Sequence, residues 1–498
     1  MKRKALILTI AGTLAGLAAA YGGGAWWAGK AAERTLAKQH KWLASLPYFV
    51  VTQREYQRGW FSSTESATIK LNPQLYRFML EREGEALPQF EVRYTQHVQH
   101  GPLPLLLSGN PTPYKAVVTT DFVFSAETRQ FLEKMFGQQR PISIQNRIGF
   151  GDDGRIALGV PAFRYEETLA GVSVTWQGLK AELQYDGDFN KVKLDASAAG
   201  LAVTVRDRGR FAFDGLQLAL DQARGKTGLM LGTSSAQIKG MTLELSGAQA
   251  LRAELQDLAY RSELSENGDF VDGSADLKLA RLLLDGQQYG PAELATEAKH
   301  LHGPTLAKLG RELTRLQQQA PDREQLAAEV LKLARDQGMP LLAHDPQLAI
   351  KSLYMRVPDG DIRFAGRVGL KGFVPADLDQ PASFVSKLNA DAEFTMPRQV
   401  LEAVASWQAR ALFGGTDSQI AQADLDFLVS QFVEGQLQRM ASQNLIRIDG
   451  DTLSARASLA GGRFVLNGRA VPMPWDEPTA PGPDDDPDAV AASAPPQP

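Results

Sequence analysis

Cysteine is absent from the 498 residues of the chain. This absence excludes disulfide bonds, thiolate metal sites and cysteine nucleophiles. It leaves the redox compartment open, because an oxidising periplasm favours proteins without stray thiols and cytosolic proteins also lack them. Histidine is scarce, at 6 residues, and no Gly-x-Ser-x-Gly nucleophile elbow occurs. We therefore expect a protein without catalytic activity and without a cofactor.

Neither sign of charge is in excess. The 53 Lys and Arg residues oppose 57 Asp and Glu residues, and no basic run is interleaved with aromatic residues. We therefore expect no nucleic-acid partner. The mean hydropathy of −0.23 excludes a membrane protein with many spans.

Long apolar runs are also missing, except at the N-terminus. The segment Ala5–Gly29 has no charged residue and follows the basic residues Lys2–Lys4. As a helix it would be about 36 Å long, enough for a hydrocarbon core of about 30 Å. Trp26 and Trp27 would then lie near the far headgroup layer, which indole rings prefer. The pattern predicts one transmembrane anchor.

Two alternatives accompany this anchor. It is also compatible with a cleaved signal peptide, with Ala18 and Ala20 at the processing positions. Gly12 and Gly16 have the small-xxx-small spacing of helices that pair in membranes, which would make a homodimer. Basic residues on both sides of the span do not decide its orientation. Long domains translocate regardless of such charges, so we expect a cytoplasmic N-terminus and a periplasmic body.

The remainder is predicted to be an α+β body, mainly an antiparallel β-meander with several covering helices. Short alternating runs extend from Ile142 to about Leu301, and Leu179, Ala181 and Leu183 illustrate one apolar face. Helical spacing is expected at 126–136, at 304–342 with a break at Pro321, at 398–412 and at 417–441. The predicted segments are 1–30 (anchor), 31–141 (N-terminal hairpin region), 142–303 (meander), 304–475 (helices and closing hairpins) and 476–498 (disordered acidic tail).

Histidines provide the main candidate metal site. His97 and His100 form one close pair, and His300 and His302 form a second; each pair leads into Gly-Pro. Of the two pairs, only His300 and His302 would share one face of a regular strand, as two metal ligands require. The ordinary alternative is that each pair ends a strand and hydrogen-bonds a turn. Acidic pairs lack calcium-loop spacing, and Gly225-Lys226-Thr227 is expected to be a hairpin turn.

The turn Arg58-Gly59-Trp60-Phe61 has two interpretations. Arginine and aromatic residues at a turn are typical of a partner-binding edge. The alternative, which we favour, is a packed corner in which Gly59 is left-handed and Trp60 covers the core.

Four motifs together resemble a known family. They are Tyr56–Ser63, the Gly24–Gly29 exit from the apolar segment, His100-Gly101-Pro102, and the closing Leu466–Pro472. With the basic head and single span, they resemble the YdgA-like family of Gram-negative envelope proteins over all but the acidic tail. The resemblance implies an inner-membrane anchor, a periplasmic body and no known reaction. The strand pattern is more loosely similar to AsmA-type envelope proteins, which are associated with lipid transport.

These observations favour a non-enzymatic role in cell-envelope maintenance or assembly. A long sheet with one apolar face must cover that face with helices, close on itself, or leave a groove. A groove would suit lipid or another extended hydrophobic ligand. The alternatives are a periplasmic chaperone or assembly partner of an envelope protein, and an unrecognised hydrolase.

Overall fold

The computed structural model describes residues 2–46, 48–72, 91–247, 250–319, 323–404 and 422–474. The chain divides into two compact units, residues 1–365 and 366–498. The predicted acidic tail lies outside the described residues.

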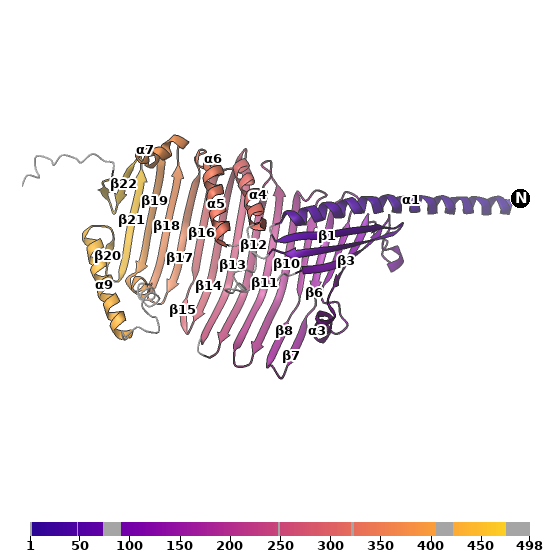
Figure 1. Cartoon of the computed structure of the whole chain (residues 1–498), viewed down its shortest axis with the longest axis horizontal. Helices are drawn as coiled ribbons and strands as arrows, with labels where there is room; N and C mark the ends of the chain where they lie inside the picture. Colours follow the sequence, from indigo (N-terminus) through magenta and orange to yellow (C-terminus); the bar gives the residue numbers. More distant parts are fainter. Residues whose placement is uncertain are drawn as a thin grey trace, which may run out of the picture. The chain divides into compact units, whose positions relative to one another are not determined.

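Unit 1 begins with one continuous helix of 44 residues, α1 (Lys2–Ser45). The later part of α1 lies alongside β1 and β3, and the earlier part extends beyond the strands (Figure 1). Its other helices are η2 (Leu106–Ser108), α3 (Ala126–Phe136), α4 (Gly303–Gln319), α5 (Arg323–Gln337) and α6 (Met339–Leu342).

The strands of unit 1 are antiparallel. They are β1 (Phe49–Arg58), β2 (Ser62–Leu71), β3 (Glu91–His100), β4 (Ala116–Val123), β5 (Ser143–Ile148), β6 (Gly154–Val160), β7 (Phe163–Glu167), β8 (Val172–Trp176), β9 (Leu179–Tyr185), β10 (Lys191–Val205), β11 (Gly209–Arg224), β12 (Met230–Leu245), β13 (Leu251–Asn267), β14 (Phe270–Leu284), β15 (Gln287–Tyr289), β16 (Ala292–His302) and β17 (Gln347–Val357). β18 (Gly360–Leu370) crosses the division between the units.

Most neighbouring strands follow one another along the chain, so the predicted meander is confirmed. One exception is β6, which pairs with β9, while β7 and β8 form a hairpin between them. Another is β14, which pairs with β16 as well as with β15. β10 then pairs with β9 along its first half and with β8 along its second. The strands β10 to β14 are 15–17 residues long, and each pairs with the next along nearly its whole length.

Unit 2 has its own small core. Its elements are η3 (Pro375–Asp379), α7 (Pro381–Lys387), β19 (Leu388–Pro397), α9 (Gln422–Ser442), β20 (Arg447–Asp449), β21 (Thr452–Ala460), β22 (Arg463–Leu466) and β23 (Arg469–Val471). Val433 and Leu437 of α9 are buried with Ile446, which directly precedes β20, and with Leu453 of β21. The predicted closing hairpin is therefore present. Residues 405–421 of the predicted helices lie outside the described residues.

The best-defined core of unit 1 lies beneath α1. Ala32 and Leu36 of α1 are fully buried against Val98, Val118 and Ile148. These three residues belong to β3, β4 and β5, and Val98 pairs directly with Val118. The helix therefore covers the first strands of the sheet.

No helix in the described part of the chain is long and apolar enough to cross a membrane. The described side chains of α1 are those of residue 16 and of residue 19 onward, so most of the apolar run from Ala5, including Gly12, lies outside them. Gly16 itself is exposed, and nothing lies within 4 Å of where its Cβ would be.

Candidate functional site

The helix α1 docks on the body through small residues. Ala25 and Ala28 are fully buried, and a Cβ on Gly29 would lie 2.5 Å from the His100 ring. The His100 Nδ1–H donates to the Ala25 carbonyl at 2.9 Å, and its Nε2 accepts from the Ser63 hydroxyl at 3.0 Å. Burial lowers the pKa of His100, so its neutral form is favoured.

Two of the sequence motifs therefore meet in space. The Gly24–Gly29 exit contacts the His100-Gly101-Pro102 element, because Pro102 lies 3.2 Å from where a Gly24 Cβ would be. Tyr21 adds a hydrogen bond from its hydroxyl to the Leu103 carbonyl at 3.3 Å. The His-Gly-Pro element thus forms part of the surface on which α1 packs.

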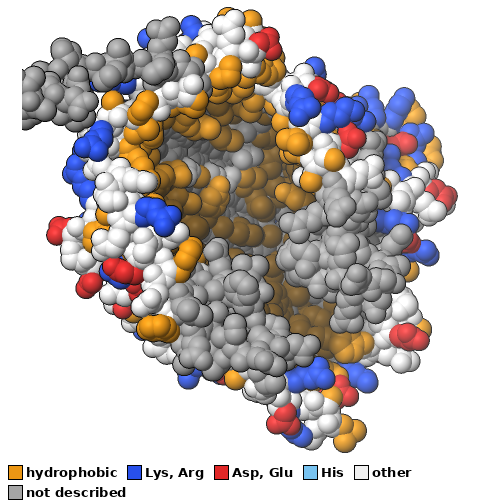
Figure 2. All heavy atoms as spheres, turned by 60° about the vertical axis from the view of Figure 1, so that its left-hand side comes forward, with side chains coloured by type: hydrophobic (Ala, Val, Ile, Leu, Met, Phe, Trp, Pro, Cys, Tyr) orange, Lys and Arg blue, Asp and Glu red, His pale blue; other side chains and the backbone are white. Residues whose placement is uncertain are grey.

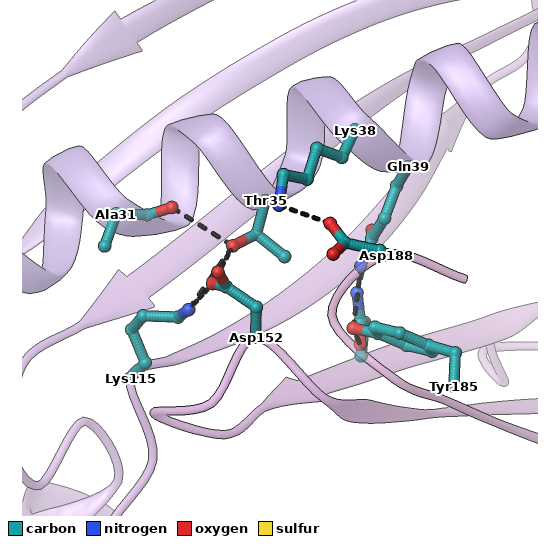
Figure 3. A network of polar contacts seen from close by, with 9 residues as sticks. Ala31, Thr35, Lys38, Gln39, Lys115, Asp152, Tyr185 and Asp188 are labelled. Atoms are coloured by element: carbon teal, nitrogen blue, oxygen red, sulfur yellow. Dashed lines mark hydrogen bonds and ion pairs between the residues drawn. The ribbon is translucent and has the colours of Figure 1, made fainter. Parts of the chain in front are cut away.

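A polar network continues the docking (Figure 3). Lys115, only 1% exposed, donates to the Asp152 carboxylate and to the Thr35 hydroxyl, and Thr35 also lies 2.6 Å from Asp152. Burial lowers the pKa of Lys115 to about 8, while the negative charge of Asp153 acts in the opposite direction. The network therefore joins α1 to the loop before β4 and to the β5–β6 turn.

Further along α1, two more groups of polar contacts hold the helix. Gln39 donates to the Tyr185 hydroxyl at 2.7 Å, and Lys38 pairs with Asp188 at 2.7 Å. His40 contacts the Tyr94 hydroxyl at 2.8 Å and lies 3.3 Å from the fully buried Glu65. Buried polar groups with several partners fix one arrangement, so α1 and the first strands form one rigid part.

The structure corrects the prediction for the Arg58-Gly59-Trp60-Phe61 turn. Gly59 has no left-handed φ, and its N–H donates to the Ser62 carbonyl at 3.0 Å. Trp60 is 65% exposed and Phe61 is 54% exposed, so neither covers the core. Arg58 reaches Glu33 of α1 at 3.3 Å. An exposed edge, the alternative, describes this turn better.

The two histidine pairs have separate surroundings. His100 lies under α1, whereas His97 is exposed beside Asp121 at 3.4 Å. His300 has a φ of +59° beside a register shift, so the strand is not regular at His300 and His302.

Each of the second pair has its own partner. The His300 Nδ1–H donates to the His344 carbonyl at 2.7 Å, and the His302 Nδ1 is 2.7 Å from the Thr305 hydroxyl. Among the described residues, no three His, Asp or Glu side chains gather where they could hold a metal ion.

The phosphate-loop candidate lies in a turn. Gly225-Lys226-Thr227 connects β11 to β12, as predicted, and the Glu266 carboxylate accepts from the Lys226 and Thr227 N–H groups. A carboxylate therefore occupies the donors that a phosphate would need.

The sheet of unit 1 has a continuous apolar face. One row of directly paired residues crosses the strands from β6 to β17: Leu158, Ala181, Ala196, Leu218, Ala236, Tyr260, Leu277, Leu294 and Leu353. Directly paired residues of an antiparallel sheet have their side chains on the same face. Every side chain in this row is hydrophobic.

The neighbouring row, one residue along, has the opposite character. It consists of Ala157, Glu182, Asp195, Ala219, Ser235, Arg261, Asp276, Ala295 and Ser352. The two faces of the sheet are therefore chemically distinct across all these strands.

Much of the apolar face is open. Leu218, Tyr260 and Leu277 are 39%, 41% and 40% exposed, and Leu264 and Leu348 on the same face are 40% and 50% exposed. Figure 2 shows hydrophobic side chains gathered in a hollow of the surface, with charged side chains along its margins. Soluble proteins rarely expose apolar patches of this extent unless the patch binds something.

The helix α1 covers the beginning of this same face. Ala116 and Ile148, buried beneath α1, are in a row that continues through Tyr185 and Val192. The apolar face therefore starts under α1 and continues across the later strands, where several of its described side chains are exposed.

The polar face has a shallow depression of about 930 Å³. Most of its lining residues belong to the polar rows, with Lys180, Glu182 and Asp276 beside the small residues Ala219 and Ala259. The mixture of charges and small side chains is that of a solvated sheet surface.

Sequence reasoning missed the network around Lys115. The residues come from α1, the loop before β4 and the β5–β6 turn, so no sequence spacing relates them. The only local signal is a lysine beside the apolar run Ala116–Val118, which indicates a buried charge.

Comparisons with known proteins place the chain in a family. Residues 2–474 match the model of the family described as "Bacterial protein of unknown function (DUF945)". The chain is 22% identical to Protein YdgA of Escherichia coli (strain K12) over 94% of this chain and 95% of that protein. No solved structure matches. The resemblance to the YdgA-like family is confirmed.

Proposed function

The chain belongs to the DUF945 family, whose function is unknown, and from that premise we propose that it is a membrane-anchored, non-enzymatic protein of the cell envelope that holds acyl chains on its apolar sheet face. In this proposal the body lies in the periplasm and the first residues lie in the cytoplasm. The open apolar face of unit 1 is the single observation that carries the proposal.

The apolar N-terminal run supports the anchor. It contains no charge from Ala5 to Gly29, and α1 continues from it into the docked part without a break. Such a helix would hold the body close to the bilayer from which lipid is taken. We favour a retained anchor over a cleaved signal peptide, because Trp26 and Trp27 are placed where the far headgroup layer would be.

The geometry of the face supports acyl chains as the ligand. The hydrophobic rows combine small residues such as Ala196 and Ala236 with larger ones such as Leu218 and Tyr260, and cross many strands. Acyl chains need length and apolar surface rather than hydrogen-bonding groups. A polypeptide in extended form would bind the same surface. This is the alternative in which the protein is a chaperone or assembly partner.

Photocrosslinking tests the ligand with a matched control. Benzoylphenylalanine is placed at Tyr260 on the apolar face, or at Arg261 on the polar face of the same strand, in the full chain in its own membrane. We expect lipid adducts at position 260 and not at 261, detected by mass spectrometry. Peptide adducts at position 260 would favour the chaperone or assembly role instead.

A second measurement uses charge. Leu218→Glu places a carboxylate on the apolar face, while Gln217→Glu places one on the other face of β11. We expect lipid that co-purifies with the gently extracted full chain to fall about tenfold or more in Leu218→Glu and to persist in Gln217→Glu. Absence of lipid from the unchanged protein, together with no adduct at position 260, contradicts the proposal.

A further inference from the structure

Six large apolar side chains are exposed around one short stretch of α1. This apolar collar consists of Trp26 (44%), Trp27 (50%), Trp60 (65%), Phe61 (54%), Leu106 (48%) and Phe150 (48%). They come from α1, the β1–β2 turn, the β3–β4 loop and the β5–β6 turn. Exposed apolar groups on four separate segments at one place indicate a common surface rather than scattered exposure.

Contacts hold these segments at the same level of the helix. Phe61 stacks on Tyr21 with ring centres 6.1 Å apart, and Phe150 stacks on Trp27 at 6.5 Å. Leu103, in the loop that contains Leu106, accepts a hydrogen bond from Tyr21. Tyr21 and Trp27 are only about 9 Å apart along a helix, so three loops reach α1 within two turns.

The chemistry of the collar is that of a membrane interface. Tryptophan is concentrated in it, and the Lys30 ammonium lies 5.9 Å from the Trp26 ring centre. Indole rings prefer the headgroup layer, and lysine there interacts with anionic lipids. The uncharged run Ala5–Gly29 lies within α1 and ends at the collar. A protein partner would not explain this position at the end of an apolar helical run.

We propose that the apolar collar lies in the headgroup layer of a phospholipid bilayer, so that the turns of the body, and not α1 alone, contact the membrane. This inference rests on the proposed anchor. Because α1 and the first strands form one rigid part, insertion of the collar fixes the orientation of unit 1 and places the start of its apolar face at the membrane surface.

The absence of cysteine allows a direct test, since a single introduced cysteine carries the only label. Trp60→Cys and Phe150→Cys report the collar, and Ala19→Cys reports the helix. Leu169→Cys, in the β7–β8 turn and 98% exposed, is the matched control far from α1 (Figure 1). Each full-length variant carries a bimane label in vesicles of phosphatidylethanolamine and phosphatidylglycerol.

We expect lipid-borne nitroxide to quench positions 60 and 150 at least about twofold more than position 169, and aqueous iodide to show the reverse order. Equal aqueous quenching at 60, 150 and 169, with position 19 in lipid, overturns the collar and leaves the anchor standing. Aqueous quenching at all four positions overturns both. Thermal unfolding of each variant establishes that the fold is kept.

Discussion

At the scale of single residues, the docking of α1 depends on the small side chains of its inner face. Gly24, Gly29, Ala25 and Ala28 let the helix backbone approach the His100 element closely enough for a side chain to reach the Ala25 carbonyl. Close packing of this kind tolerates no added methyl group.

Gly29→Ala tests this contact against Gly23→Ala in the same helix. A Cβ at Gly29 meets the His100 ring at 2.5 Å, and hydrogen bonds at both ring nitrogens hold that ring in place. We expect Gly29→Ala to lower the free energy of unfolding by about 1–3 kcal/mol. Gly23 has nothing within 4 Å of its Cβ position, so Gly23→Ala should be neutral or stabilising by up to about 1 kcal/mol. Urea unfolding measures both, and equal stability of the two variants would contradict the packing.

His100 should make the stability depend on pH. Burial lowers the pKa of folded His100 below the ordinary 6.5. At pH values between these two pKa values, the unfolded chain binds a proton at His100 that the folded chain does not bind. The free energy of unfolding should therefore rise with pH through this window and fall as pH drops below about 6.5. Urea unfolding between pH 7 and pH 5 should show a smaller decrease in His100→Gln than in the unchanged protein. Identical decreases would show that His100 contributes nothing.

At the scale of elements, the long strands do not keep one alternation from end to end. In β11 the large apolar residues are Phe211 and Phe213 before Gly215, but Leu216, Leu218 and Leu220 after it. Gly215 has a φ of +65°, and Asp257, in the middle of β13, has a φ of +50°. A left-handed residue interrupts the regular pleat, so the apolar pattern changes phase there.

Gly215→Val tests this interruption. Valine is a good strand residue, yet at a φ of +65° with Lys239 side-chain carbon 2.7 Å away it should lower the free energy of unfolding by about 1–3 kcal/mol. The control is Gly240→Val on the adjacent strand, where φ is ordinary and the nearest atom is 3.9 Å from the Cβ position. Thermal or urea unfolding compares them. A Gly240→Val variant less stable than Gly215→Val would exclude backbone conformation as the reason.

At the scale of the whole molecule, the proposed anchor in the charge-free run leads to a prediction of where the body lies. If the body is periplasmic, protease added to spheroplasts should degrade it while a cytoplasmic marker protein remains intact. The short basic head should stay protected, because it lies across the membrane. A body that resists the protease until the membrane is broken would reverse the proposed orientation.

The sequence by itself determined the secondary structure closely. The helix at 126–136, the hairpin of β1 and β2, the meander and the turn at Gly225–Thr227 all follow from local alternation and turn residues, which depend only on near neighbours along the chain. It also indicated one apolar face. The family resemblance came from short motifs, and the comparisons confirmed it.

Only the tertiary structure decided which motifs meet and which surfaces stay open. Trp60 was predicted to cover the core and is exposed, because burial depends on segments distant in sequence. The contact of His100 with α1, the network around Lys115 and the collar each join residues that lie far apart along the chain. Alternation predicts that a strand has an apolar side, but whether that side is covered depends on how helices and strands pack in three dimensions.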